Sequence, residues 1–187
     1  MNNSVLNSVN EHKHLGVILS DDGAWHKHID MIVKKAFNRL NVIRKYKFLF
    51  NRHTLEQLYI IYVRPILEYA DVVWDNSTVM LIHKLESVQI EAARIVTGGT
   101  RLSSIRLLYD ETGWEKLSDR RKDHRLTYFY KMVNNITPNY LSNILPNQFA
   151  NIHTYNTRNS SSFQPIQVRL SLYSNYFLLA AVKLWNS

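Results

Sequence analysis

The chain has 187 residues, 45% of them hydrophobic, and its formal net charge is +8 at pH 7. Only 5 Gly and 4 Pro favour a helix-rich domain over a turn-rich sandwich or barrel, and the absence of Cys excludes disulfides and a zinc ribbon. The excess of positive charge favours contact with phosphate backbones or anionic surfaces. Neither a signal peptide nor a long apolar run is evident, so we expect an intracellular protein, nuclear or cytoplasmic, without contact with a membrane.

A small β-hairpin is predicted at the start of the chain. His12–Leu19 is short, partly alternating and rich in branched residues, and Ser4–Leu6 is its expected partner across a polar turn. Asp21 or Asp22 is expected to cap the helix that follows, because short acidic side chains accept hydrogen bonds from the first free N–H groups of a helix.

The first long helix is predicted from about Ala24 to Tyr46. Hydrophobic residues recur there at spacings of three and four, which is typical of one buried face. This predicted face consists of Trp25, Ile29, Ile32, Ala36, Leu40 and Ile43.

A second, kinked helix is predicted from about Thr54 to Trp74, with a capping box formed by Thr54 and Gln57. Pro65 lies within it, although an interior proline removes a helical hydrogen bond and costs about 3 kcal/mol. A strongly buried face must offset this cost, and the spacing predicts Leu55, Leu58, Tyr62, Ile66, Tyr69 and Val73.

Further helices are predicted over about 77–97, 104–111, 118–134 and 137–144. Gly98 and Gly113 suit left-handed C-terminal caps. The helix from Ser118 has basic residues in its first turns, which oppose the helix dipole, so something beyond local helix energetics is expected to favour them: Arg120, Arg121, Lys122 and Arg125. A polar loop over 146–173 precedes a last helix, capped by Ser174.

Several short motifs, in order along the chain, are similar to the C-terminal part of a non-LTR, LINE-type (jockey-like) retrotransposon reverse transcriptase. The resemblance covers nearly the whole chain from about Glu11. The matching segments are 14–17 with Trp25 and 28–29, 64–70 with Trp74, 85–89, 92–94, 113–114, Leu117 with 120–121, 130–134, 158–160 and 181–187.

This resemblance implies a non-catalytic region of an RNA-directed DNA polymerase. The family's palm aspartates, which follow an aromatic residue and hold Mg²⁺, are not in this chain, so we expect no polymerase activity from it alone and no cofactor in it. The implied division is a remnant of the palm hairpin over 1–22, a thumb-like helical bundle over 23–100 and a helical extension over 101–187. The implied partners are a template–primer duplex of RNA and DNA, bound without sequence preference, and the upstream palm and fingers.

The candidate nucleic-acid-binding residues lie in a stretch that contains cations and no acidic residue. A thumb helix that follows a duplex would use them to offset phosphate repulsion, although a solvated helix face is the commoner explanation of such a pattern. The candidates are Lys34, Lys35, Arg39, Arg44, Lys45, Lys47 and Arg52.

Other polar clusters favour structural roles. Asp21–Asp22 fits a turn better than a metal site, and the histidines at 12, 14, 26 and 28 are better explained as solvent-facing or capping residues than as zinc ligands. Each Trp lies among apolar neighbours and is expected in the core, whereas Tyr46, Phe48 and Phe50 are candidates for base stacking.

The sequence therefore predicts a mainly α fold in which a thumb-like helical bundle follows a small β-hairpin. Its predicted role is to grip the template–primer duplex behind a catalytic palm. The alternative is a helical structural or protein-interaction domain, or a decayed fragment, that does not bind nucleic acid.

Overall fold

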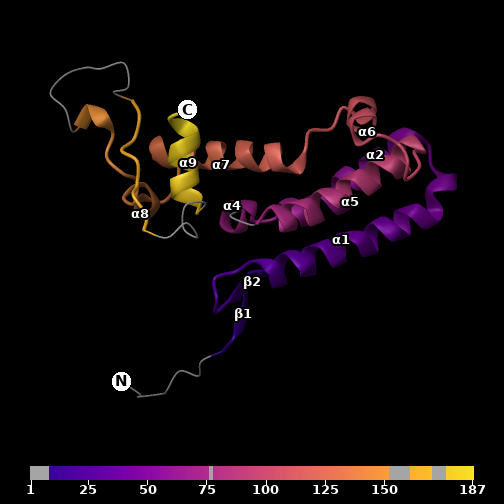
Figure 1. Cartoon of the computed structure of the whole chain (residues 1–187), viewed down its shortest axis with the longest axis horizontal. Helices are drawn as coiled ribbons and strands as arrows, with labels where there is room; N and C mark the ends of the chain where they lie inside the picture. Colours follow the sequence, from indigo (N-terminus) through magenta and orange to yellow (C-terminus); the bar gives the residue numbers. More distant parts are fainter. Residues whose placement is uncertain (1–8, 76–77, 152–160, 170–175) are drawn as a thin grey trace. The chain divides into compact units, whose positions relative to one another are not determined.

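The computed structural model describes residues 9–75, 78–151, 161–169 and 176–187. The protein is mainly helical, and a two-stranded antiparallel hairpin precedes the helices (Figure 1). The predicted fold class is thus confirmed. None of the helices in these ranges is both long and apolar enough to cross a membrane.

The hairpin pairs β1 (Glu11–His14) with β2 (Val17–Ser20), and His14 lies opposite Val17. The prediction of one strand over His12–Leu19 is wrong, because the chain reverses within it. Leu15 and Gly16 form the turn, with φ angles of 46° and 87°; glycine adopts such positive values without steric cost. Ser4–Leu6, the predicted partner strand, lies outside the described residues.

Backbone contacts group the chain into two compact units. Unit 1 comprises 1–70 and 77–117, and unit 2 comprises 71–76 and 118–187. The functional division at residues 22 and 100 that the resemblance implies stays a prediction.

Unit 1 is built around two long helices, α1 (His26–Tyr46) and α5 (Val79–Thr97), which pack against each other. The remaining helical segments of the unit are a 3₁₀ turn (Lys47–Leu49), α2 (Arg52–Leu58), a π turn (Tyr59–Val63), α3 (Arg64–Glu68) and α6 (Ile105–Thr112). The predicted stripe of α1 is buried from Ile29 to Ile43, whereas Trp25 is half-buried. Gly98 and Gly113 end α5 and α6 in the left-handed conformation, as predicted.

The π turn explains how the fold accommodates Pro65. At its end the Arg64 N–H bonds to the Tyr59 carbonyl, five residues back, instead of four. A new helical segment, α3, then begins, with Pro65 in its first turn. A proline there removes a donor that a first turn does not need, so most of the expected interior penalty is avoided.

The π turn also changes which residues are buried. Leu55, Tyr59, Val63 and Leu67 form the buried stripe, each four positions after the last. In a regular α-helix, steps of four drift by about 40° each, and one wider turn offsets this drift. The predicted stripe is therefore wrong beyond Leu55: Tyr62, Tyr69 and Val73 are all more than half exposed.

The predicted helix also ends early and starts differently. Tyr69 is extended and Ala70 has a φ of 54°, so the helix stops at Glu68. The Asn51 side chain, and not a Thr54–Gln57 capping box, caps α2 by accepting from the Thr54 N–H at 2.8 Å.

The predicted acidic cap of α1 is likewise absent. Trp25 is the N-cap and makes no side-chain capping bond. Asp22 accepts from the Ala24 N–H at 2.9 Å, and Asp21 accepts from the Asp22 N–H at 3.0 Å. Both aspartates are exposed and shape the turn, as their spacing before Gly23 also predicts.

Unit 2 contains α4 (Asp71–Trp74), α8 (Asn139–Ser142), a 3₁₀ turn (Phe149–Asn151), α9 (Phe177–Trp185) and α7 (Leu117–Val133) from its second residue onward. Its apolar core joins Phe129 of α7 to Ala181 and Val182 of α9. Phe163, from the predicted polar loop, is buried in this core, and its N–H and carbonyl both bond to the Asn186 side chain. Ser174, the predicted cap of the last helix, lies outside the described residues.

The register set by the π turn is testable with two adjacent residues of equal size. Leu67 is fully buried and Ile66 only partly, whereas a regular helix would bury Ile66 instead. We expect Leu67→Ala to lower the free energy of unfolding by about 2–5 kcal/mol, the range for a cavity in a core. Ile66→Ala should cost at most about half as much. Urea unfolding followed by far-ultraviolet circular dichroism measures both, and the reverse order would contradict the buried stripe.

Candidate nucleic-acid interface

The predicted basic residues lie along one stretch of unit 1 but not on one face. Lys34, Lys35, Arg39, Arg44 and Lys45 belong to α1. The 3₁₀ turn begins with Lys47, and α2 begins with Arg52. These residues differ in how freely they could contact a phosphate, because the arginines are bonded to oxygen atoms of the protein itself.

The arginines of this set hold the helices of unit 1 together. Arg44 Nη2 lies 2.8 Å from Glu91 Oε1 on α5, and Arg52 Nη1 lies 2.7 Å from Glu111 Oε1 on α6. Arg39 Nη1 donates to the Tyr62 carbonyl at 2.8 Å, within the π turn. These guanidinium groups are partly exposed, but each already has an oriented acceptor.

The lysines of the set differ from the arginines. In the described part of the chain, no carboxylate pairs with Lys34, Lys35, Lys45 or Lys47, which we call the open lysines. Lys34 and Lys45 are eleven residues apart, about three helical turns, so they lie on one line along the outside of α1. An outward line of unpaired ammonium groups suits contact with polyanions.

A hollow of about 340 Å³ lies where the hairpin turn meets α1 and α3. Leu15 and Gly16 line one side, Pro65 and Tyr69 line another, and the open lysine Lys35 lies at its edge together with Lys13. Tyr69 Oη donates to the Leu15 carbonyl at 2.8 Å, and a Cβ on Gly16 would lie 3.4 Å from the Tyr69 ring. Two motifs of the resemblance, 14–17 and 64–70, are thus in direct contact.

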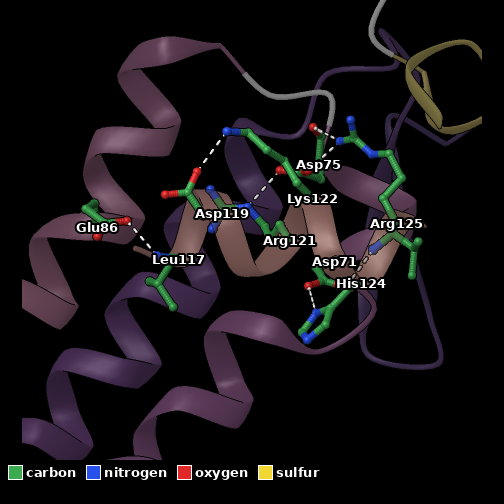
Figure 2. Close-up of polar contacts among 10 residues, drawn as sticks. Asp71, Asp75, Glu86, Leu117, Asp119, Arg121, Lys122, His124 and Arg125 are labelled. Atoms are coloured by element: carbon green, nitrogen blue, oxygen red, sulfur yellow. Dashed lines mark hydrogen bonds and ion pairs between the residues drawn. The ribbon is translucent and has the colours of Figure 1, made fainter. Parts of the chain in front are cut away.

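The basic start of α7 is explained by an acidic partner within unit 2 (Figure 2). Arg121 Nε lies 2.7 Å from Asp75 Oδ1, and Arg125 Nη2 pairs with Asp75 Oδ2 and with the Asp75 carbonyl. The Arg121 side chain is only 1% exposed. Arg121 and Arg125 are therefore buried structural cations, and neither is available to a phosphate backbone.

A neighbouring pair adds to this cluster. His124 Nδ1 and Asp71 Oδ2 lie 2.6 Å apart, and the Val72 N–H donates to Asp71 Oδ1 at 2.8 Å. Burial raises the pKa of Asp71, and the hydrogen bond and charge of His124 act in the opposite direction. Figure 2 shows this pair beside the contacts of Asp75 with the arginines, so Asp71 and Asp75 together fasten 71–75 to α7.

The candidate metal residues do not gather. Among residues 9–75, 78–151, 161–169 and 176–187, no group of three His, Cys, Asp or Glu side chains is placed to hold a metal ion. His12, His14 and His26 are exposed, as predicted. His28 is not: it is buried, its Nδ1 accepts from the Ile18 N–H at 3.3 Å, and burial lowers its pKa. It joins α1 to the hairpin.

The predicted stacking candidates lie at the surface, whereas of the four Trp predicted in the core only Trp74 is fully buried and Trp25, Trp114 and Trp185 are half-buried. Tyr46, Phe48 and Phe50 are 43%, 86% and 42% exposed. Trp74 is buried, and Trp185 packs on Phe129 and Phe163 in unit 2. The surface aromatics are accompanied by open lysines, since Lys45 Nζ lies 5.5 Å from the Tyr46 ring centre and Lys47 Nζ lies 5.0 Å from that of Phe48.

A buried polar network in unit 1 is the feature that periodicity misses. Gln89, only 1% exposed, accepts from Tyr59 Oη at 2.7 Å and donates to Tyr109 Oη at 3.3 Å and to the Glu115 carbonyl at 2.8 Å. Tyr109 Oη also donates to Glu86, which accepts from the Leu117 N–H (Figure 2). Burial and the bond to Glu86 raise the pKa of Tyr109. The one feature of the sequence that could have indicated this network is Gln89, a polar residue on the apolar face of α5.

No protein-family model matches the chain, and no curated protein or solved structure is significantly similar to it. What the chain does must therefore be inferred from its own residues. Those residues offer a line of unpaired lysines and exposed aromatics on unit 1, together with ion pairs that serve the fold.

The buried ion cluster of unit 2 can be tested with one carboxylate. Asp75→Asn leaves two guanidinium groups without their counter-charge, so we expect unfolding of unit 2 to require about 3–5 kcal/mol less. The matched control is Asp119→Asn, because Asp119 pairs with Lys122 at 2.8 Å with both side chains about half exposed. Exposed pairs contribute at most about 1 kcal/mol. Equal losses in urea unfolding would show that the Asp75 cluster does not stabilise unit 2.

Proposed function

We propose that the chain is the non-catalytic C-terminal part of a LINE-type reverse transcriptase and grips the template–primer duplex. The observation that carries this proposal is the ordered set of motifs from residue 14 to residue 187 that resembles the thumb and post-thumb region of that family. In this role the chain works inside the cell, in the nucleus or cytoplasm, next to the palm and fingers of the same polyprotein. Magnesium belongs to the absent palm.

Contacts between the motifs are consistent with this proposal. The 14–17 turn meets the 64–70 segment through Tyr69 and Leu15. The 85–89 segment bonds to the backbone at Leu117 and Glu115 through Glu86 and Gln89. Short motifs that are far apart in the sequence thus share one scaffold, which is what a common ancestral fold requires.

The open lysines supply the expected binding chemistry. Helix α1 has 21 residues, so it is about 30 Å long and spans nearly one turn of a duplex. Lysine is a flexible point charge that neutralises phosphates without reading bases. Such charges along α1 and the turn after it would hold a duplex in any register, which a polymerase that moves along its template needs.

A second candidate function is a helical protein-interaction domain without affinity for nucleic acid. The observation in its favour is that Arg39, Arg44 and Arg52, nearly half of the predicted basic set, are already bonded to acceptors within unit 1. If the open lysines only keep the surface hydrated, the remaining basic charge has no binding role.

Salt dependence distinguishes these two functions. A fluorescein-labelled RNA–DNA duplex is titrated with the protein at several salt concentrations. Phosphate contacts release counterions, so log affinity should fall linearly with log salt, by about 0.9 per contact. Replacing the open lysines Lys34, Lys35, Lys45 and Lys47 with Gln should weaken binding about tenfold or more and reduce that slope by up to about 3–4.

The control must remove the same amount of charge elsewhere. Lys116 and Lys131 are exposed, and their double Gln variant is compared with Lys34→Gln, Lys45→Gln. We expect the slope to change only for the latter pair. Binding that is undetectable or independent of salt would favour the interaction domain, and equal effects of the two pairs would show that only net charge matters.

A further inference from the structure

We propose that unit 1 carries a docking site for an acidic amphipathic helix of a protein partner. The site, which we call the apolar hollow, is lined by Val42, Tyr46, Leu49, Phe50, Leu58 and Tyr62, with Ile43 at its floor and Arg39 at its edge. Lys45, one of the open lysines, lies beside the hollow over the ring of Tyr46, and the hollow adds a partner that duplex binding does not involve.

The hollow is a formed feature with an apolar lining. Its volume is about 410 Å³, and Arg39 is the only charged residue that lines it. Val42 is 59% exposed, Leu49 75% and Tyr62 54%. Single exposed apolar residues are ordinary, whereas a contiguous concave group of them is a candidate interaction site.

The backbone is arranged in a way that keeps these side chains outside. The 3₁₀ turn at Lys47–Leu49 ends α1 and sends the chain back along it through α2. The π turn then buries Tyr59 and Val63 and leaves Ile61 and Tyr62 exposed. Arg39 fixes this arrangement by donating to the Tyr62 carbonyl. π turns are uncommon and are frequent at functional sites.

The charge around the hollow selects the partner. Lys45 Nζ lies over the ring of Tyr46, which lines the hollow, and Lys47 follows Tyr46 in the 3₁₀ turn that supplies Leu49. Neither lysine pairs with a carboxylate of the described chain. Residues 34–52 contain no Asp or Glu. A second copy using the same face would bring these cations together, so self-association there is disfavoured, whereas carboxylates flanking an apolar stripe complement the rim.

The concave shape favours a helix as the occupant. An amphipathic helix inserts large apolar side chains at positions i, i+3 or i+4 and i+7 into such a groove. Glutamates beside those positions would reach Arg39, Lys45 and Lys47 at the edge. Exposed aromatics with lysines also suit base stacking, so single-stranded nucleic acid is the competing occupant in the test.

The test uses a labelled helical peptide of about 18 residues, or five turns, with Leu and Phe at the insertion positions and Glu on the remaining face. A scrambled peptide of the same composition and a peptide with Lys in place of Glu serve as probe controls. Fluorescence anisotropy with the full chain at about 0.15 M salt measures binding. We expect the amphipathic acidic peptide to bind at least about tenfold more tightly than either control.

Two matched variants locate the site on the protein. Leu49→Glu places a carboxylate in the hollow and should weaken peptide binding at least about tenfold. Leu102→Glu makes the same change at another exposed Leu, 97% accessible and outside the hollow, and should leave affinity unchanged. Circular dichroism confirms that both variants keep the fold.

Any of the following results would overturn the proposal. Equal binding of the scrambled peptide, or equal affinity of the Leu49→Glu and Leu102→Glu proteins, would show that the hollow does not dock an acidic helix. If Leu49→Glu instead abolishes binding of a single-stranded oligonucleotide and leaves the peptide unaffected, the hollow is a base-stacking surface. Duplex binding is measured separately with a Lys34→Gln, Lys35→Gln variant, which keeps Lys45 and Lys47 and the lining of the hollow, so each proposal is tested by its own data.

Discussion

The arrangement of unit 1 depends on the π turn at Tyr59–Val63. A regular helix through this segment would rotate its buried side progressively away from α1 and α5, and would place Pro65 in mid-helix without a donor. One wider turn corrects both problems at once. It keeps Leu55 and Leu67 on the same buried line, and it lets a new helical segment begin just before the proline.

The consequences of that turn extend into both polar and apolar contacts. Tyr59 is directed inward, where its hydroxyl meets Gln89 and its ring stacks on Trp114 at 4.5 Å. Tyr62 is directed outward, where it borders the apolar hollow. Beyond α3, the extended Tyr69 reaches the hairpin turn. A local change in helix winding therefore decides which side chains hold unit 1 together and which remain for a partner.

Much of the fold follows from the sequence, and the wrong predictions of secondary structure lie where the backbone departs from a regular helix or strand. The stripe of α1 and the glycine-ended helices α5 and α6 were predictable because spacing and caps are local signals. The buried stripe that passes Pro65 was not predictable, because a regular period of 3.6 residues per turn does not hold through the π turn at Tyr59–Val63. The hairpin itself was predictable, but the assignment of His12–Leu19 to one strand was wrong, because the chain reverses at Leu15 and Gly16 within a segment whose composition suits one strand. Of the site, the positions of the basic residues were predictable, but not which of them have partners, since Glu91 and Glu111 are distant in sequence.

Arg121 and Arg125 show how a local conflict points to a distant contact. The sequence places them near the start of a helix, where a cation opposes the helix dipole, and burial of Arg121 would be costly without a counter-charge. Asp75, which directly follows α4, resolves both problems. A cation at the wrong end of a helix is thus better evidence for a buried partner than for a binding surface, and the same criterion removes these arginines from any nucleic-acid interface.

Arginine and lysine have different roles in the basic stretch from Lys34 to Arg52. Arg39, Arg44 and Arg52 each meet a fixed acceptor, which suits a planar guanidinium with several oriented donors. The open lysines lie among them in the sequence, and no carboxylate of the described residues pairs with them. A strongly hydrated ammonium on a flexible stem loses little by remaining in water and can meet phosphates at variable positions. The arginines therefore take the internal acceptors of this stretch and the lysines keep their ammonium groups in water, which is the state that the proposed contact with phosphates requires.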